Sequence, residues 1–274
     1  MTKPFQRALL ALALTGLVSG VQAQRPWLLA SSTVVDSKDP WVTVDAASSD
    51  NAFDIDNMPL KLAALLVTGP DGARVLPLNM FTGHLRSSFD IKLAQAGTYK
   101  ASLVTTSVTA YYKLNGETKR WRGSEQDWAL QLPPGAQDVK LTRMHSRLET
   151  FVSTGKPNEV VFKPTGAGLE FVPLTHPNDL RAGEKATWRF LLDGKPLANQ
   201  PFSLVPGGVR YRGVLGEIRQ TTDANGEISF TVPPAGMYLL SSNWPETTPD
   251  AQDQPMQPPA RRLSYGATLE VLPQ

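Results

Sequence analysis

The chain contains no cysteine among its 274 residues. This absence excludes disulfide bonds, thiolate nucleophiles and metal sites built on cysteine. The stability of the fold must therefore come from buried apolar surface. Without the signal peptide that is predicted below, roughly 250 residues remain, which are enough for two domains of about 110 to 130 residues, each with a core of its own.

Histidine is scarce, since the chain has only His84, His145 and His176. No two of them stand at the i, i+2 or i, i+4 spacing that places two imidazoles on one metal ion. A joint site would require distant strands to meet, so this spacing favours histidines in turns or on the surface. The sequence by itself assigns no metal ligand.

Local catalytic motifs are also absent. The chain has no Gly-x-Ser-x-Gly nucleophile elbow, no phosphate-binding glycine loop and no His-Glu-x-x-His zinc motif. Because triads and paired carboxylates can be assembled from distant positions, an unrecognised hydrolase stays open as an alternative. We predict a protein that is not an enzyme.

Long apolar runs are missing except at the N-terminus. Lys3 and Arg7 precede an apolar run from Ala8 to Val18, and small residues follow it. This pattern predicts a secretory signal peptide over residues 1–23, with a mature, periplasmic chain that begins at Gln24. No stretch approaches the ~20 apolar residues of a membrane-spanning helix, so we predict no membrane-spanning segment.

Charge of either sign is not in excess. The chain has 27 Lys and Arg against 25 Asp and Glu, and the predicted signal peptide holds two of the basic residues and no acid, which leaves 25 against 25. A formally neutral chain gives no overall attraction to nucleic acid or to an anionic membrane. We therefore predict no nucleic-acid partner.

What the sequence does contain is β-strand alternation that twice ends in the same phrase. An alternating run from Phe89 leads to Gly97 and Tyr99, and a second run from Ile228 leads to Gly236 and Tyr238 at the same spacing. In each copy a strand ends at a glycine, and an inward-pointing tyrosine begins the next strand. We interpret each copy as a hairpin of a β-sandwich.

Two such copies predict an all-β protein with two tandem immunoglobulin-like or prealbumin-like β-sandwich domains after a cleaved signal peptide. The small residues Thr165 to Gly168 mark the predicted boundary. The N-terminal domain is predicted over residues 24–164. The C-terminal domain, similar to the regulatory domain of carboxypeptidases, is predicted over 165–274, with a Pro-rich loop at 245–260.

Shorter signals lie inside the first predicted domain. Asn115-Gly116 between two strand-like runs is a strong hairpin signal. Ser124 and Asp127 stand in capping-box spacing, which predicts a short helix over residues 125–131.

Several phrases, in their order and spacing, together resemble the exported bacterial family called domain of unknown function 4198. They are Arg25 to Leu29, Lys119 to Gly123, Leu169 to Pro177, Ala182 to Glu184, Leu192 to Leu197, Thr222 to Glu227 and Pro234 to Tyr238. The resemblance implies a periplasmic protein linked with uptake of a transition metal, nickel or cobalt in particular. It implies as partners a membrane transporter or a TonB-dependent receptor.

Members of this family commonly carry a histidine at or next to the new N-terminus, and related sequences place another after the segment equivalent to residues 53–56. This chain has Gln24 and Asn57 at those positions. Both departures remove an imidazole, the ligand that best suits nickel, cobalt, copper or zinc. A divalent metal ion stays open as a cofactor, and no organic cofactor is predicted.

Oxygen ligands are concentrated between Asp50 and Asn57, where Asp54 and Asp56 are the predicted binding residues. Carboxylates suit calcium or magnesium better than nickel. The segment does not fit an EF-hand loop, because Met58 and Pro59 occupy positions that need a ligand and a glycine. A solvated loop is the alternative.

A second candidate surface lies at the predicted Asn-Gly hairpin. Residues Lys119 to Arg122, with Tyr111 and Tyr112 opposite, are predicted to form an aromatic and cationic face for a sugar or an anionic metal chelate. The predicted ligand-binding residues on it are Tyr112, Trp121 and Arg122. The alternative is that the aromatic residues pack inward while the basic residues protect an edge strand. Trp27 is a further predicted ligand-binding residue.

These observations predict a non-enzymatic periplasmic accessory or binding protein associated with uptake of a transition metal or a metal chelate. The alternative is a carbohydrate- or protein-binding β-sandwich module without metal, which uses Trp27, Trp121 or the sheet edges.

Overall fold

The computed structural model describes residues 24–56, 58–246 and 259–274. The predicted signal peptide, Asn57 and most of the predicted Pro-rich loop lie outside the described residues. With 55% of residues in strands and 6% in helices, the all-β prediction is confirmed. No helix in the described ranges is long and apolar enough to cross a membrane.

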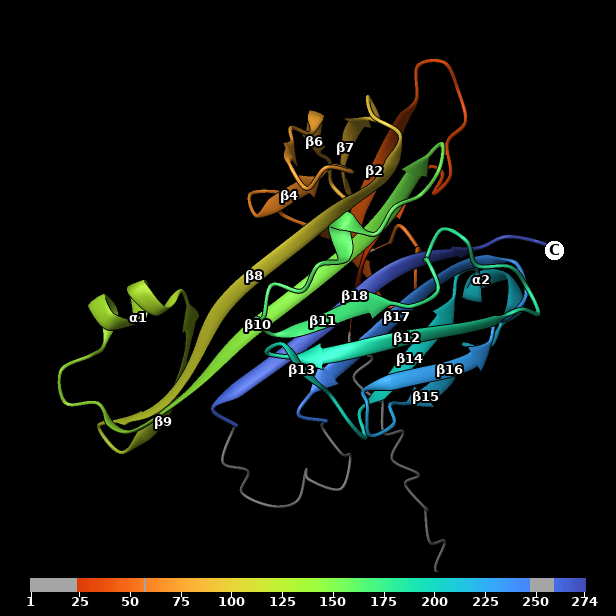
Figure 1. Ribbon diagram of the computed structural model, residues 1–274. Helices are drawn as coiled ribbons and strands as arrows, with labels where there is room; N and C mark the ends of the chain where they lie inside the picture. Colours follow the sequence, from red (N-terminus) through yellow and green to blue (C-terminus); the bar gives the residue numbers. More distant parts are fainter. Residues whose placement is uncertain (1–23, 57, 247–258) are drawn as a thin grey trace, which may run out of the picture.

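The strands form three sheets (Figure 1). The first sheet has the order β1 (Arg25–Ala30), β2 (Trp41–Ser49), β7 (Ser87–Lys92) and β6 (Leu78–Thr82), and β3 (Met58–Pro59) pairs with β2. The third sheet has the order β11 (Leu169–Pro173), β12 (Lys185–Leu192) and β13 (Lys195–Pro196), and β16 (Glu227–Thr231) pairs with β12.

The central sheet is the largest. Its order is β15 (Ile218–Thr221), β14 (Pro201–Pro206), β17 (Gly236–Trp244), β18 (Arg261–Val271), β10 (Gln137–Thr154), β8 (Gly97–Leu114), β4 (Leu65–Thr68) and β5 (Arg74–Val75), and β9 (Glu117–Gly123) pairs with β8. The helical elements are α1 (Glu125–Gln131), α2 (Val209–Arg212) and the 3₁₀ turn η1 (Val160–Phe162).

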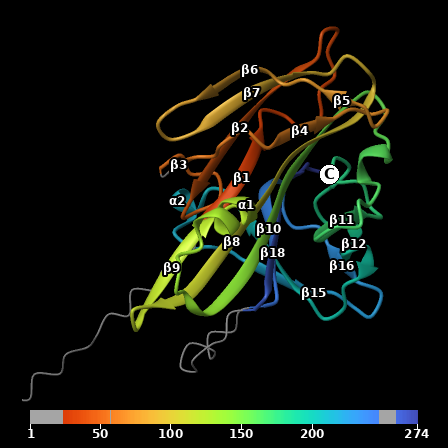
Figure 2. The ribbon, with the colours of Figure 1, turned by 90° about the vertical axis from the view of Figure 1, so that its left-hand side faces the viewer.

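The first and third sheets pack on opposite faces of the central sheet, so the molecule has three layers (Figure 2). Strand β10 shows the arrangement, because successive side chains of a strand point to opposite faces. Leu148 and Val152 belong to the core under the first sheet, whereas Phe151 belongs to the core under the third. Two sandwiches therefore share one sheet.

The two halves of the central sheet are joined by a parallel ladder. Arg143 to Thr150 of β10 pair with Arg261 to Thr268 of β18. This ladder connects strands on either side of residues 164 and 165, where the sequence predicts a domain boundary. Parallel pairing requires a long connection, which here is supplied by the strands of the second sandwich.

The repeated Gly-x-Tyr phrase is not a hairpin, and this corrects the prediction. Strand β7 lies in the first sheet and β8 in the central sheet, and likewise β16 lies in the third sheet and β17 in the central sheet. Each copy therefore carries the chain from one layer to another. Alternation correctly predicts a strand with one buried face in each copy, but it does not determine which strand lies beside it in the sheet.

The tyrosine of each copy fixes the crossing. Tyr99 donates its hydroxyl hydrogen to the Gln95 carbonyl at 3.0 Å and accepts from the Gln95 amide at 2.8 Å. Tyr238 donates to the Pro234 carbonyl at 2.8 Å, again four residues upstream. Both rings are buried, and this geometry is the tyrosine corner of immunoglobulin-like sandwiches.

Gly97 is required at its corner for two reasons. Its φ of 130° lies in a region that side chains with a Cβ rarely adopt. A Cβ at this position would also stand 2.6 Å from Pro70 Cβ. Gly236, with a φ of 152°, has no neighbour closer than 3.9 Å, so steric crowding is confined to the first corner.

The predicted Asn-Gly hairpin and the predicted helix are both confirmed. Asn115 and Gly116, with φ values of 52° and 81°, form the two-residue turn between β8 and β9. The helix α1 spans Glu125–Gln131, and the Ser124 side chain accepts from the Asp127 amide at 3.0 Å. We call residues 108–143 the arm, because they extend beyond the two sandwiches (Figure 1).

Candidate functional site

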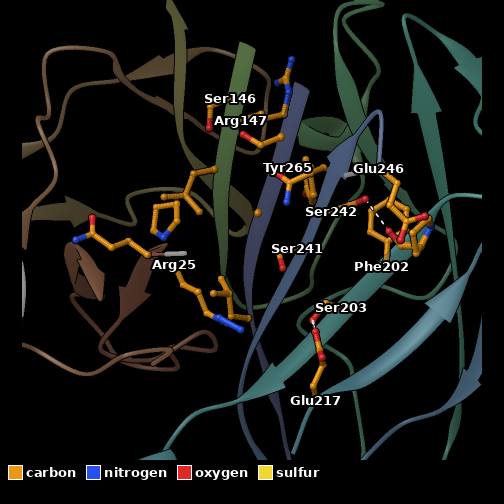
Figure 3. A pocket seen from close by; sticks show the side chains of 18 of the residues that line it. Arg25, Ser146, Arg147, Phe202, Ser203, Glu217, Ser241, Ser242, Glu246 and Tyr265 are labelled. Atoms are coloured by element: carbon orange, nitrogen blue, oxygen red, sulfur yellow. Dashed lines mark hydrogen bonds between the residues drawn. The ribbon is translucent and has the colours of Figure 1, made fainter. Parts of the chain in front are cut away.

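A groove of about 470 Å³ lies between the N-terminal strand and the central sheet (Figure 3). Gln24, Arg25 and Pro26 form one wall. Strands β10, β18, β17 and β14 form the floor, and Glu217 and Arg219 stand at the far rim. The first residues of the predicted mature chain therefore border the groove.

The floor of the groove is a row of small polar side chains that crosses four strands. Ser146 of β10 is opposite Ser264 of β18, and Gly266 of β18 is opposite Ser241 of β17. Ser241 is in turn opposite Ser203 of β14. Since residues directly opposite each other share a face, these hydroxyl groups all face the first sheet.

The same alternation explains why the groove is open. Phe202, Leu240 and Tyr265 neighbour the floor serines in sequence and point to the other face, into the core under the third sheet. Large apolar side chains thus fill one side of the central sheet. Small hydroxyl-bearing side chains leave space on the other.

Charged residues stand at the rim of the groove. Glu217 accepts from the Ser203 hydroxyl at 2.5 Å and lies 3.2 Å from Arg219 Nε. Burial raises the pKa of Glu217, but the hydrogen bonds from Ser203 and Arg219 and the charges of Arg219 and Arg25 outweigh it, so the net pKa is lowered. Glu217 is therefore ionised at neutral pH and holds the Arg219 guanidinium in position.

The chemistry that this arrangement supports is polar recognition. The hydroxyl row supplies donors and acceptors, Arg25 and Arg219 supply positive charge, and the carboxylates of Glu217 and Glu246 supply negative charge. Histidine is not among the lining residues, so the serines have no imidazole base beside them. Throughout the described ranges, no three His, Cys, Asp or Glu side chains are gathered in a way that would hold a metal ion.

Trp27 has no exposed surface, in contrast to its predicted role as a ligand platform. Its exposed fraction is 0%, and its Nε1 donates to Ser49 Oγ at 2.8 Å. The ring packs edge-on against Phe53 and joins Val205 and Leu239 in a small cluster between the first and central sheets. The structure therefore assigns Trp27 to packing.

The predicted oxygen ligands do not form a cluster among the described residues. Asp54 is half-buried and accepts from Asn51 Nδ2 at 3.2 Å, and Asp56 is exposed. No third carboxylate or histidine joins them within those ranges. A calcium ion would need more protein oxygens than these two side chains provide.

Tyr112, Trp121 and Arg122 do not share one face, which corrects that prediction. Trp121 is opposite Ala110 and therefore lies on the same face as Tyr112, whereas Arg122 is opposite Thr109 on the other face. Tyr112 and Trp121 both contact Trp128 of α1, with ring centroids 5.6 and 5.2 Å away. These rings fasten the helix to the arm.

The three histidines stay apart, as their spacing predicts. His176 lies in a turn, where its ring accepts from the Asn178 amide at 3.1 Å and contacts Thr98 Oγ1 at 3.0 Å. Burial lowers the pKa of both His145 and His176, so both are neutral at pH 7. His176 serves local hydrogen bonding, whereas Nδ1 of His145 is buried without a hydrogen-bond partner among the described residues.

A buried cluster of charged residues, which the sequence analysis missed, lies on the opposite face of the central sheet from the groove. Tyr265 donates to Glu149 Oε2 at 2.9 Å, and burial, followed by the charge of Glu149, raises the pKa of Tyr265 well above its usual range. Glu149 also lies 3.5 Å from Arg147 and 3.7 Å from Lys100. The remaining space is about 10 Å³, too small for a substrate.

The cluster clamps the segment between the two sandwiches. Glu170 lies 3.9 Å from Arg147 and accepts from the Thr165 and Gly166 amides at 2.7 and 2.8 Å. Nearby, Asp193 accepts from Arg261 at 2.8 Å and from the Gly168 amide at 2.9 Å, and these bonds lower its pKa to about 2. Carboxylates thus satisfy the amides of Thr165, Gly166 and Gly168.

Neither the serine floor nor the charged cluster could be read from local spacing, because each is assembled from strands far apart in the chain. By contrast, the sequence does predict which residues of β8 and β9 lie on the same face of the arm. A two-residue Asn115-Gly116 turn places Leu114 opposite Glu117, and counting back from that pair places Arg120 opposite Tyr111.

Comparison with solved structures gives weak overall similarity. The D0–D1 domains of intimin give a TM-score of 0.24 with 13% sequence identity, over 89% of this chain and 96% of that chain. A D1–D4 ectodomain fragment of ICAM-5 gives 0.22 with 9% identity, over 91% and 51%. Elastase-activated Escherichia coli alpha-2-macroglobulin gives 0.21 with 10% identity, over 90% and 30%.

A search of curated proteins finds no match. A family model matches residues 21–246, which is most of the chain. By this match, the chain belongs to the family described as "Domain of unknown function (DUF4198)".

Proposed function

We propose that this protein is a non-enzymatic periplasmic binding protein that holds a small anionic metal chelate in the groove under β1. The observation that carries the proposal is the groove itself, which combines a floor of serine hydroxyls with Arg25 and Arg219 at its rim. Its volume of about 470 Å³ is in the range of small-molecule sites.

The lining favours a chelate over a bare ion. The described residues contain no cluster of metal-ligating side chains, and Gln24 supplies no imidazole. A carboxylate chelator brings its own ligands to the metal and presents free oxygens to the protein. Guanidinium groups bind carboxylates through two parallel hydrogen bonds, and the serines are placed to bind hydroxyl groups.

The predicted cleavage site strengthens the preference for an anion. If the mature chain begins at Gln24, its α-amino group lies in the groove wall beside Arg25. An α-amino group has a pKa near 7.7 to 8.0 and carries most of its positive charge at neutral pH. Cyclisation of the N-terminal glutamine would remove this charge and weaken binding.

The cellular setting rests on the predicted signal peptide and on the family resemblance. The signal peptide supports export, and the family resemblance supports an accessory to uptake that passes its ligand to a membrane transporter or to a TonB-dependent receptor. The transported metal in this proposal is nickel or cobalt, and it is cargo rather than a resident cofactor.

The experiment is isothermal titration calorimetry on protein that begins at Gln24, with nickel citrate, citrate alone and nickel chloride as ligands. We expect the two citrate ligands to bind more tightly than nickel chloride, and Arg25→Gln and Arg219→Gln each to weaken them. Lys185→Gln, which removes an exposed positive charge from β12 in the third sheet, is the matched control and leaves binding unchanged. If neither citrate ligand binds with a Kd below about 1 mM, which corresponds to about 4 kcal/mol, the proposal is wrong.

A further inference from the structure

The arm carries a cationic surface with a tyrosine at its centre. Tyr111 of β8 is opposite Arg120 of β9 on one side and Lys140 of β10 on the other. Because opposite residues share a face, the three side chains form one row across three strands. Arg122 is opposite Thr109 and adds a further positive charge to the same face.

A hollow of about 700 Å³ opens beside this row. Its lining includes Tyr111, Lys113, Thr118, Asp138, Lys140 and Arg262. The hollow coincides with an irregularity in β10, where the pairing with β8 shifts register between Gln137 and Lys140. Asp138 adopts a φ of 52° there, so a bulge moves the β10 backbone away from a regular ladder.

The positive charge of this surface is largely uncompensated. Lys113 is paired with Asp138 at 2.7 Å, but within the described residues Arg120, Arg122, Lys140 and Arg262 form no ion pair. The arginine carbon Cζ of Arg120 lies 6.0 Å from the centre of the Tyr111 ring, at the outer limit of a cation–π contact. As far as the described residues go, Asp138 is the acidic side chain that faces these cations, and its ion pair is with Lys113, which leaves the four cations for an external anion.

Protection of a sheet edge explains only part of this arrangement. Arg120 and Arg122 lie on β9, which pairs only with β8 in the described sheet, and charged residues there discourage further pairing. That role needs neither a half-exposed aromatic ring on the neighbouring strand nor a hollow beside it. The ring, the hollow and the surrounding cations together have the composition of a ligand site.

We propose that this hollow is a second binding site, separate from the groove, and that its ligand is an acidic sugar. The Tyr111 ring provides a flat apolar surface for the C–H face of a sugar ring. Lys140 and Arg262 are placed to bind a carboxylate or phosphate group, while Thr118 and Asp138 bind hydroxyl groups. The site does not depend on the proposed chelate groove.

The two sites lie on one face of β10 but at different points along it. Lys140 in the hollow and Ser146 in the groove are six residues apart, which is about 20 Å along a strand. On β18 the sites come closer, because Arg262 in the hollow and Ser264 in the groove are two residues apart, about 7 Å along the strand. Substitutions at Tyr111 and Lys140 therefore leave the groove intact, and Arg25→Gln in the groove serves as a test of independence.

The experiment is calorimetry with trigalacturonic acid, glucose 6-phosphate and neutral maltotriose at low ionic strength. We expect at least one acidic sugar to bind and maltotriose to bind at least tenfold more weakly. Tyr111→Ala and Lys140→Gln should each weaken the acidic sugar about fivefold, which corresponds to about 1 kcal/mol. Binding of trigalacturonic acid alone assigns carboxylate recognition, and binding of glucose 6-phosphate alone assigns phosphate recognition.

Matched variants separate recognition from folding and from general attraction of anions. Tyr111→Phe keeps the ring and should bind as the wild type does, and a thermal melt checks that Tyr111→Ala is folded. Lys119→Gln removes a positive charge from the other face of β9 and should leave binding unchanged. The proposal is overturned if neither acidic sugar binds, if maltotriose binds equally well, or if Lys119→Gln weakens binding as much as Lys140→Gln.

Discussion

Replacement of Glu149 by glutamine tests whether the buried charged cluster holds the two sandwiches together. Within the cluster two positive groups, Arg147 and Lys100, face two carboxylates, Glu149 and Glu170. Glutamine has the shape of glutamate and still accepts the hydrogen bond from Tyr265. The substitution therefore removes charge while it leaves packing nearly unchanged.

The expected loss follows from burial. Only 4% of the Glu149 side chain and 8% of the Arg147 side chain are exposed, so water cannot replace the missing carboxylate at Arg147. Breaking a buried pair by removal of one partner costs about 3–5 kcal/mol. Because Lys100 is 14% exposed and partly solvated, we expect the lower end, about 3 kcal/mol.

Urea unfolding followed by circular dichroism measures this loss, and calorimetry should show a decrease in Tm of about 6–12 °C for a chain of this size. Addition of Lys100→Met to Glu149→Gln removes the surplus positive charge and should recover part of the stability. Glu117→Gln, which breaks the exposed pair with Lys119, is the control and should cost at most about 0.5 kcal/mol. A loss at Glu149 no larger than this control would refute the reasoning.

Three further predictions concern the corners and the clamp. Tyr99→Phe removes two hydrogen bonds, whereas Tyr238→Phe removes one. Urea unfolding should therefore show a loss of about 1–3 kcal/mol in the free energy of unfolding for Tyr99→Phe and of about 0.5–1.5 kcal/mol for Tyr238→Phe. Equal losses would contradict the hydrogen-bond account. Gly97→Ala should destabilise more than Gly236→Ala in thermal melts, because only the first new Cβ meets a backbone-fixed proline ring; the reverse order would contradict it. Asp193→Asn should lower the free energy of unfolding at pH 7, because the pKa of Asp193 in the folded state, about 2, lies below its value near 4 in the unfolded state. The difference in this free energy between wild type and variant should shrink as the pH falls from about 4 to about 2. An undiminished difference at pH 2 would exclude this linkage.

Much of the local structure was predictable because its signals act over a few residues. The Asn115-Gly116 turn and the Ser124 cap gave the hairpin and the helix at the right positions. The repeated glycine and tyrosine mark two equivalent corners, although the alternation before each copy predicts a hairpin. The candidate sites were predicted poorly, because their residues come from strands far apart in the chain.

The sequence by itself determined the all-β class, the positions of the turns and the absence of cysteine chemistry, since alternation, turn residues and composition are local properties. Only the tertiary structure decided which strands became neighbours. The parallel pairing of β10 with β18 brought Ser146 beside Ser264 and created the floor of the groove. Packing of the first sheet on the central sheet also buried Trp27 against Val205 and Leu239, because the strands that cover this side chain are distant from it in the chain.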